Sequence, residues 1–288
     1  MALLTGVGVA IITPFTKDFA VDYNSLEKLI DHLIHCQVNY IVTLGTTGET
    51  ATLSEEEKIE ILNFTYEKVN DRIPVVVGIG GNNTAQVIEQ LQTWPLEKAT
   101  AILSVSPYYN KPSQEGIYQH YAAIAKATSK SIILYNVPGR TMSNITAETT
   151  IRLANDFKNI IGTKEASGNM VQCMHLVKNR PEGFMLISGD DHITLPLIAC
   201  GFDGVISVAA NSFAAEFSLL VHQAMSGNFE EARNQQNRLL ELMDMLFVEN
   251  NPAGVKAFCA IKGLCENVLR LPLVPLSEKY MDKVKALS

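Results

Sequence analysis

The residues of this chain that could do chemistry follow short apolar runs. Lys164 ends the run "IIGTK", and Tyr135 lies in "IILYNV". A β-branched run bounded by Gly and Asn is typical of a buried strand, yet lysine is among the side chains least often buried. A neutral lysine amine forms a Schiff base with a carbonyl substrate, and a phenol beside an imine can carry the protons that this step needs.

The direction in which Lys164 points decides between two interpretations. Counting by two along the strand places Lys164 on the same face as Gly162 and Ile160, so we expect it to point inward across a small residue. There its ammonium group would be partly desolvated, which favours the neutral, nucleophilic amine. The alternatives are a solvated lysine at the sheet rim and, for Tyr135, a core tyrosine with a satisfied hydroxyl group.

Residues that could hold a carboxylate group also follow apolar runs. Thr46 and Thr47 lie in "GTTGET", where two hydroxyl groups and backbone N–H groups could bind a carboxylate or simply shape a glycine turn. Arg140 in "YNVPGRT" is a natural bidentate clamp beside a substrate carboxylate and otherwise a surface residue. Together these residue types favour imine chemistry on a keto acid.

Other candidate sites are weaker. "GIGGNN" does not match the G-x-G-x-x-G dinucleotide pattern, and no Walker, H-E-x-x-H or G-x-S-x-G motif occurs. Asp190, Asp191 and His192 resemble part of a metal site, although Asp191 is as easily a helix cap. No glycine loop suited to a cofactor phosphate follows the last two apolar runs. We therefore expect neither a metal ion nor pyridoxal phosphate.

The overall composition argues against several classes of protein. The 288 residues carry 23 Lys and Arg against 30 Asp and Glu without a basic cluster, so nucleic acid and anionic membranes are poor partners. The five cysteines are scattered without a C-x-x-C pair, which argues against a disulfide framework or a zinc site and favours a reducing cytosol. The apolar N-terminus lacks the basic region of a signal peptide, and no run is long enough to span a bilayer. We expect a soluble, unprocessed, cytoplasmic protein.

Eight apolar runs of strand length recur along the chain, and each is nearly continuous in hydrophobicity. They cover residues 7–13, 39–45, 73–80, 100–106, 131–137, 159–165, 184–190 and 204–210. Such runs are typical of parallel strands covered on both faces. Helix-like segments lie between them, with predicted starts at Ser25, Ser54, Thr84, Ser113, Thr146 and Asp191. Eight strand–helix units predict an α/β fold, a (β/α)8 TIM barrel, and a doubly wound open sheet is the alternative.

Strand signals cease after about residue 226. The remaining segment reads as three amphipathic helices, broken at Asn250–Pro252 and Pro272–Pro275. We therefore divide the chain into a catalytic barrel over residues 1–225 and a C-terminal helical extension over residues 226–288 that packs on the barrel. In such barrels the functional residues lie at the carboxyl ends of the strands, which is where the candidate residues above fall.

The same stretches resemble a known family. "GTTGET", "SPYYNKPSQEG", "YNVPGRT", "GTKEASGN" and "GVISVAAN" occur in this order and are similar to signatures of the 4-hydroxy-tetrahydrodipicolinate (dihydrodipicolinate) synthase family, which belongs to the pyruvate-dependent class I aldolases. The resemblance extends from about Gly6 to the C-terminal helices. It implies a lyase of lysine and diaminopimelate biosynthesis that condenses pyruvate with L-aspartate 4-semialdehyde through a pyruvate imine on Lys164, without a separate cofactor.

The resemblance also implies roles for the polar residues. Tyr135 would relay protons through Thr46 and through Tyr109 of a neighbouring subunit. Thr47 would hold the carboxylate of pyruvate, and Arg140 would hold that of the semialdehyde.

Further residues and the assembly follow from the same resemblance. Gly189 and the backbone of Ile206 would line the pocket. A tyrosine donated by a second subunit implies a homodimer, usually paired into a homotetramer, with Asn251, Pro252 and the C-terminal helices serving packing and assembly.

Two other functions stay open at this point. N-acetylneuraminate lyases and keto-deoxy sugar acid aldolases share the barrel and the imine lysine. The sialate lyases typically carry Ser–Thr where this chain has Thr46–Thr47, and they lack an arginine at the position of Arg140, so both positions favour the synthase. A non-catalytic barrel that binds a keto acid is opposed by the presence of Lys164 and Tyr135.

The resemblance further implies a regulatory lysine site at the dimer interface, near Thr50, Ala51, Glu55, Lys58, Asn82, Gln86 and Tyr108. Feedback-inhibited relatives usually carry histidines at the positions of Glu55 and Lys58 and a glutamate at that of Gln86. In this chain the glutamate is neutralised and a cation is added, which should repel a second ammonium group, although Glu55 partly offsets this. We expect weak or absent inhibition by L-lysine.

Overall fold

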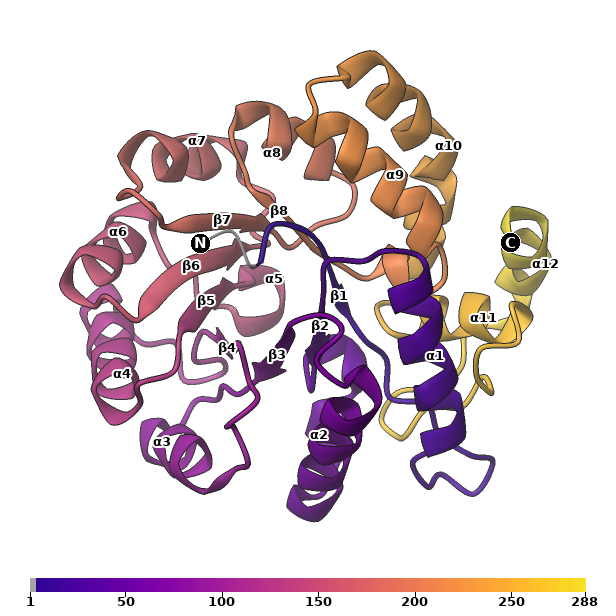
Figure 1. Ribbon diagram of the computed structural model, residues 1–288, viewed down its shortest axis with the longest axis horizontal. Coiled ribbons are helices and arrows are strands. Elements are labelled where there is room, and N and C mark those ends of the chain that lie inside the picture. Colours follow the sequence, from indigo (N-terminus) through magenta and orange to yellow (C-terminus); the bar gives the residue numbers. More distant parts are fainter. Residues whose placement is uncertain (1–3) are drawn as a thin grey trace.

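The computed structural model describes residues 4–288 and contains a closed barrel of eight parallel strands (Figure 1). The strands pair in chain order, and the eighth closes on the first. They are β1 (Gly6–Ala10), β2 (Tyr40–Thr43), β3 (Val75–Gly78), β4 (Ala101–Val105), β5 (Ile132–Asn136), β6 (Ile160–Glu165), β7 (Met185–Ser188) and β8 (Gly204–Ser207). The predicted (β/α)8 barrel is confirmed, and the open doubly wound sheet is wrong.

Helices follow the strands and surround the barrel (Figure 1). They are α1 (Tyr23–His35), α2 (Glu55–Val69), α3 (Thr84–Thr93), α4 (Gln114–Ala127), α6 (Ala147–Asp156), α7 (Met170–Asn179), α8 (Thr194–Cys200) and α9 (Ala214–Met225). Short elements lie at the carboxyl ends of the strands: η1 (Thr46–Gly48), η2 (Thr50–Thr52), α5 (Pro138–Thr141) and η3 (Ala209–Asn211). These short elements occupy the end of the barrel where active sites form.

Three of the predicted helix starts are confirmed. The side chains of Ser54, Ser113 and Thr146 each accept a hydrogen bond from a backbone N–H group in the first turn of α2, α4 and α6. Glu57 completes the capping box of α2, because its carboxylate accepts from the backbone N–H group of Ser54.

The other three helix starts differ from the prediction. Helix α1 begins before Ser25, because the Asp22 side chain accepts from the backbone N–H group of Ser25. Asn83, and not Thr84, caps α3. Asp191 caps no helix, because its carboxylate is buried and accepts from two backbone N–H groups just after β8.

A register shift corrects the prediction for Ile160. In the β5–β6 pair, Ile160 and Gly162 lie opposite two successive residues of β5, so Ile161 is an extra residue in β6. The alternation of side chains therefore changes at this point, and Ile160 belongs to the apolar layer between barrel and helices. Lys164 stays on the inward face, because it pairs with Tyr135, a member of the cluster inside the barrel.

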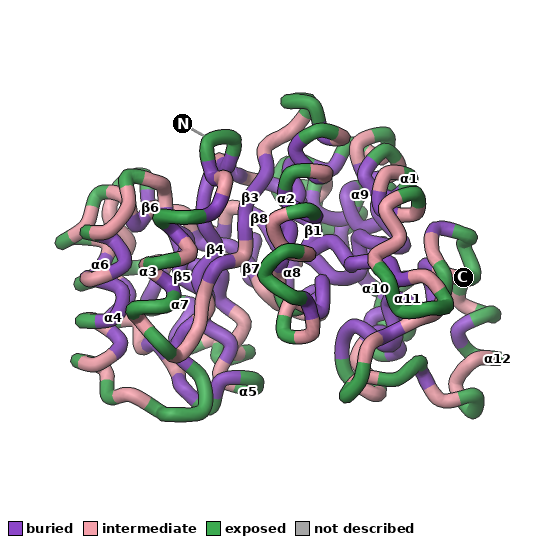
Figure 2. The backbone as a smooth tube through the Cα atoms, turned by 90° about the horizontal axis from the view of Figure 1, so that it is seen from below, coloured by how far each residue is buried: buried purple, intermediate pink, exposed green. Residues whose placement is uncertain are grey.

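Two apolar clusters hold these layers together. One fills the barrel with inward side chains of the strands, among them Tyr40, Val76 and Ile187. The larger one lies between the strands and the surrounding helices. Figure 2 shows the strands buried and the outer faces of the helices exposed. A parallel sheet covered on both faces explains why the eight runs are apolar almost without interruption.

The chain continues after α9 with α10 (Phe229–Phe247), α11 (Ala253–Ile261) and α12 (Glu278–Leu287). Helix α10 packs on α9, and α11 and α12 pack on α10, at one side of the barrel (Figure 1). The breaks expected near residues 250–252 and 272–275 fall between these helices. Within residues 4–288, no helix has the length and apolarity that crossing a membrane requires.

Candidate active site

A cavity of about 780 Å³ opens at the carboxyl ends of the strands. Its lining includes six of the residues predicted to act on substrates: Lys164, Tyr135, Thr46, Thr47, Arg140 and Gly189. They come from the ends of β2, β5, β6 and β7, or from the turns that directly follow these strands. The barrel therefore brings together residues that are far apart in the sequence.

Lys164 points into this cavity, as its place on the strand predicted. Its residue is only 5% exposed, and its Nζ atom lies 4.3 Å from the centroid of the Tyr135 ring. The register of the β5–β6 pair sets this contact, because Tyr135 and Lys164 are direct partners across the two strands. A solvated rim lysine is therefore excluded, and the amine and the phenol share one enclosed space.

Gly189 leaves room for the Lys164 side chain. A Cβ atom built on Gly189 would lie 2.9 Å from Cε and 3.1 Å from Cγ of Lys164, and 2.6 Å from Cβ of Ala166. Such distances are too short for ordinary carbon contacts. Any larger residue at this position would displace the lysine amine.

Thr46 and Thr47 begin the η1 turn after β2 and lie differently. Thr47 is buried, and its Oγ1 atom accepts a hydrogen bond of 2.9 Å from Nδ2 of Asn251, between α10 and α11. Thr46 is exposed at the cavity wall. The Thr47 hydroxyl group is thus oriented by the C-terminal extension and keeps its own hydrogen for donation to a ligand, whereas that of Thr46 lies open at the cavity wall.

Arg140 lies in α5, beyond the end of β5, with an exposed side chain that lines the cavity. Its Nη2 atom donates to the carbonyl oxygen of Asn251 at 3.4 Å. No ion pair is formed by Arg140 among residues 4–288, so its guanidinium group can bind an anion. Asn251 thus contacts both residues that were expected to hold carboxylates, although the sequence assigned it only to packing and assembly.

A buried polar network behind the site escaped the sequence analysis. The Glu165 carboxylate, directly after Lys164, accepts hydrogen bonds from the side chains of Asn136 and Gln172 and from the backbone N–H group of Ser167. This network ties the ends of β5 and β6 to α7. Polar residues next to Tyr135 and Lys164 on strands that are otherwise apolar were the available signal.

Two of the residues predicted to act on substrates lie outside the cavity lining. Tyr109 is 88% exposed and does not line the cavity of its own chain. Ile206 is buried inside the barrel, and Val208, two residues further on, lines the cavity in its place.

The Asp190–His192 segment lies at the cavity wall. Nδ1 of His192 lies 3.5 Å from Oδ1 of Asp190, and Nε2 lies 3.1 Å from Oδ1 of Asp244 in α10; these carboxylates raise the pKa of His192. Burial raises the pKa of Asp191. No group of three or more His, Cys, Asp or Glu residues between 4 and 288 is arranged to hold a metal ion.

Most of the residues expected to form a regulatory site make up one part of the cavity lining, which we call the arm. Thr50, Ala51, Lys58, Asn82, Gln86 and Tyr108, six of the expected regulatory residues, line it. Glu55 does not line the cavity but pairs with Lys58, whose Nζ atom lies 2.7 Å from the carboxylate.

These residues suit one kind of chemistry. A lysine amine in an enclosed space can form an imine with a carbonyl carbon, and the adjacent phenol can move protons there. The β2 turn and Arg140 offer two separate places for carboxylates. The site thus fits a keto acid joined to a second carboxylate-bearing molecule.

Comparisons with known proteins agree with this chemistry. A model of the dihydrodipicolinate synthetase family matches residues 3–288. A 4-hydroxy-tetrahydrodipicolinate synthase from Parabacteroides distasonis is 53% identical over 98% of this chain and 95% of its own. The structure of dihydrodipicolinate synthase from Thermotoga maritima superimposes with a TM-score of 0.96 at 42% identity, over 99% and 97% of the two chains. The structure of DHDPS from Cyanidioschyzon merolae with lysine bound superimposes with a TM-score of 0.95 at 37% identity, over 99% of this chain and 97% of that one.

Proposed function

The chain belongs to the dihydrodipicolinate synthetase family, and we propose that Lys164 is the residue on which its reaction proceeds. The protein condenses pyruvate with L-aspartate 4-semialdehyde to 4-hydroxy-tetrahydrodipicolinate, in the diaminopimelate route to lysine. This lyase chemistry uses a lysine of the chain itself, with no metal ion or organic cofactor. The observation that supports Lys164 most strongly is its burial in the cavity with Nζ beside the Tyr135 ring.

The proposed reaction begins with an imine. Nζ of Lys164 attacks C2 of pyruvate, and the carbonyl oxygen leaves as water after two proton transfers, which we assign to Tyr135. Loss of a proton from C3 gives an enamine, whose C3 then attacks the aldehyde carbon of the semialdehyde. The amino group of the semialdehyde closes the ring by attacking C2, and this releases Lys164.

The two carboxylates are assigned to different residues of the cavity lining. We place the carboxylate of pyruvate at Thr47 and the adjacent backbone N–H groups of the η1 turn, and that of the semialdehyde at Arg140. Thr46, exposed at the cavity wall, would connect Tyr135 to a proton donor. Gly189 keeps the lysine side chain in place.

We further propose that Tyr109 completes the proton relay in a second copy of the chain. Its side chain is 88% exposed, and its backbone φ of 72° turns it outward from the β4–α4 loop. The neighbouring Tyr108 is also exposed. A homodimer would cover both tyrosines, and pairing of dimers into a tetramer is the further expectation.

Three further proposals concern the location of the protein, the division of its chain and its response to L-lysine. We infer a cytosolic protein, which its five free cysteines support. We also infer a functional division into the barrel and an extension from residue 226. For the arm lined by Lys58 and Gln86, we propose weak or absent binding of L-lysine, because a cation stands where a ligand ammonium group would approach.

Trapping of the imine tests the central proposal. The protein is incubated with pyruvate and borohydride, and its intact mass is compared with that of Lys164→Ala treated in the same way. A reduced pyruvate adduct on the parent protein alone is expected. An adduct on both proteins, or on neither, would contradict the assignment of Lys164.

The same preparation distinguishes the second substrate. L-aspartate 4-semialdehyde is expected to be consumed with pyruvate, whereas N-acetylneuraminate is expected to remain uncleaved. Cleavage of the sugar acid at a comparable kcat/KM would contradict the assignment of the synthase reaction.

A further inference from the structure

The turn that carries Thr46 and Thr47 is held by a distant part of the chain. Asn251 donates to the Thr47 hydroxyl group at 2.9 Å, and the backbone N–H group of Arg270 donates to Oε2 of Glu49 at 3.1 Å. The ammonium group of Lys256, in α11, forms an ion pair with Oε1 of the same glutamate. The two hydrogen bonds join residues 204 and 221 positions apart. The C-terminal extension therefore reaches the substrate turn directly.

Glu49 is the residue on which the shape of this turn depends. It lies between η1 and η2 with φ 54° and ψ 33°, a left-handed conformation that is unfavourable for residues other than glycine. Such a conformation persists only where the surroundings impose it. Its side chain is 0% exposed, and its backbone oxygen also accepts from the Thr52 hydroxyl group.

Lys256 is the partner that fixes the Glu49 carboxylate. Its side chain is likewise 0% exposed, and its Nζ atom donates to the carbonyl oxygen of Val268 at 2.8 Å and lies 4.2 Å from the Phe15 ring centroid. Burial lowers the pKa of Lys256, although the nearby Glu49 opposes this. Apolar residues of similar volume often stabilise a protein as well as a buried ion pair, so stability alone does not explain this pair.

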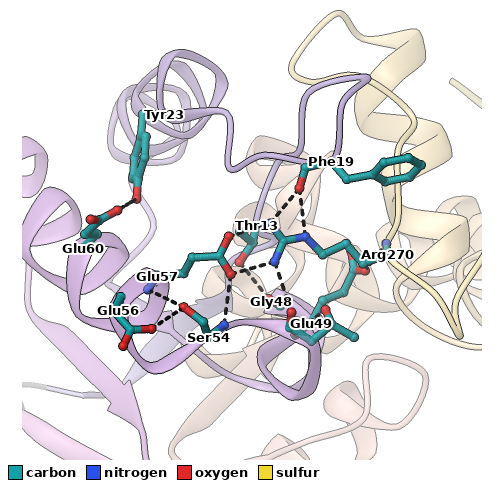
Figure 3. Close-up of polar contacts among 11 residues, drawn as sticks. Thr13, Phe19, Tyr23, Gly48, Glu49, Ser54, Glu56, Glu57, Glu60 and Arg270 are labelled. Atoms are coloured by element: carbon teal, nitrogen blue, oxygen red, sulfur yellow. Dashed lines mark hydrogen bonds and ion pairs between the residues drawn. The ribbon is translucent and has the colours of Figure 1, made fainter.

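Arg270 reinforces the same junction from outside. Its guanidinium group donates to both carboxylate oxygens of Glu57, at 2.7 and 2.6 Å, and to the carbonyl oxygen of Thr52 at 3.1 Å. Figure 3 shows this residue between Glu57 and the backbone of Phe19, next to Glu49. The end of η2 and the start of α2 are thus tied to the segment that follows α11.

We propose that Lys256 is a positioning residue for pyruvate: through Glu49 it sets the place of the turn that receives the substrate carboxylate. Lys256 does not line the cavity, so its effect on the substrate passes through Glu49, Gly48 and Thr47. This inference rests on the proposed function, in which Thr47 holds the carboxylate of pyruvate. It gives the C-terminal extension a part in substrate binding besides packing.

The double variant Glu49→Gln/Lys256→Met tests this role, because it removes both charges while keeping the sizes of the side chains. We expect the KM for pyruvate to rise roughly fivefold or more, because small displacements of binding groups weaken substrate contacts strongly. The pyruvate concentration that gives half-maximal borohydride trapping should rise in parallel. The KM for L-aspartate 4-semialdehyde should stay within about twofold, since Arg140 donates to the carbonyl oxygen of Asn251 and contacts neither Glu49 nor Lys256.

Lys262→Met is the matched control. Lys262 ends the same helix, is exposed, and contacts the Phe213 ring at 4.0 Å without reaching the turn. Both KM values of this variant should equal those of the parent protein.

A folded double variant with the parental KM for pyruvate would overturn the proposal, and so would equal rises in both KM values. If the double variant does not fold, Glu49→Asp, which keeps both charges but shortens the link to Lys256, is measured by the same two criteria, with the same expected direction. Trapping at saturating pyruvate separates the two proposals. Variants that are fully trapped at saturating pyruvate, but need more pyruvate for half-maximal trapping, support the positioning role. A parent protein that is not trapped at all would contradict the function of Lys164 itself.

Discussion

Two loops at the same end of the barrel are held in opposite ways. The turn after β2 is fixed inside its own chain, by Asn251, Lys256 and Arg270 of the C-terminal extension. The loop after β4 carries Tyr109, which is 88% exposed. Its hydrogen bonds to the neighbouring loop are made by side-chain amides: Asn82 donates to the carbonyl oxygen of Tyr108, and Asn110 donates to that of Asn82. One loop is enclosed by its own chain and the other projects from it.

The difference indicates which part of the site each chain completes alone. Groups that receive pyruvate must be in place before the substrate arrives, and buried contacts within the chain provide this. A side chain that serves a neighbouring site must instead project, and an exposed tyrosine in a positive-φ conformation does so. In the dimer that we propose, fold and assembly would therefore divide the site between a part within one chain and a part shared by two copies.

The largest effect is expected from a change beside Lys164. Gly189→Ala should lower kcat/KM for pyruvate by about 100-fold or more, because the added Cβ atom displaces the Lys164 amine. Gly139→Ala is the matched control, since nothing lies within 4 Å of a Cβ atom there, although Arg140 follows directly. Steady-state kinetics and borohydride trapping measure both. Equal activities of the two variants would show that Gly189 does not position the lysine.

The projecting loop can be tested by complementation. Tyr109→Phe should reduce kcat by about 10- to 100-fold through loss of the proton carrier, without lowering the thermal midpoint. Co-expression of Tyr109→Phe with Lys164→Ala should restore activity, because each mixed dimer contains one site with an intact lysine and an intact partner tyrosine. In purified mixed dimers, in which one of the two sites is intact, about half of the parental activity is expected.

The complementation is measured on mixed dimers purified through two different affinity tags. Dimers of each single variant, prepared in the same way, provide the controls. Activity no higher than theirs would place Tyr109 outside the neighbouring site.

The enclosed turn should respond in stability as well as in activity. Arg270→Lys loses the two parallel hydrogen bonds to Glu57, and we expect a loss of about 1 to 3 kcal/mol in the free energy of unfolding. Lys111→Met, in the projecting loop, should change it by less than about 0.5 kcal/mol. Denaturant titration of both variants makes the comparison, and similar losses would show that the two loops are held alike.

This contrast also marks what the sequence could predict. The eight strands and the inward Lys164 follow from short-range patterns, because apolar continuity and alternation are local properties. The ion pair of Glu49 with Lys256 joins positions about 200 residues apart, and neither residue alone distinguishes a buried pair from two surface charges. The bulge at Ile161 has only a weak local signal, Gly162 directly after it, because an isolated glycine in a strand often marks a bulge but does not say which residue is extra.

Two histidines extend the comparison to pH. His192 connects the cavity wall to α10 through Asp190 and Asp244, and its pKa is raised in the folded protein. Protonated His192 therefore stabilises the fold at pH values below its pKa in the unfolded chain. This stabilisation is lost as the pH rises through its pKa in the folded protein. His120, behind the β4 loop and bonded to Thr84, has its pKa lowered to about 4 by burial. It therefore destabilises the fold as pH falls from its unfolded pKa of about 6.5 toward 4.

Thermal unfolding between pH 5 and pH 8 measures these opposite slopes. His192→Gln should cost most stability at pH 5 and least at pH 8, whereas the cost of His120→Asn should shrink as pH falls. The same slope for both variants would contradict these assignments.

The smallest expected effect is an absence of inhibition. The cavity arm holds the Lys58 ammonium group, with a side chain 14% exposed and paired to Glu55, and the neutral amide of Gln86. An L-lysine molecule in this arm would bring its own ammonium group beside that of Lys58. The Glu55 carboxylate offsets little of this repulsion, because it is already paired with Lys58. Millimolar L-lysine should therefore leave the steady-state rate almost unchanged. In Lys58→His/Gln86→Glu, where the cation is replaced and an acidic group added, the same concentration should inhibit measurably. Half-inhibition of the parent protein at sub-millimolar lysine would refute this interpretation, because the charges of Lys58 and Gln86 would then not determine what the arm binds.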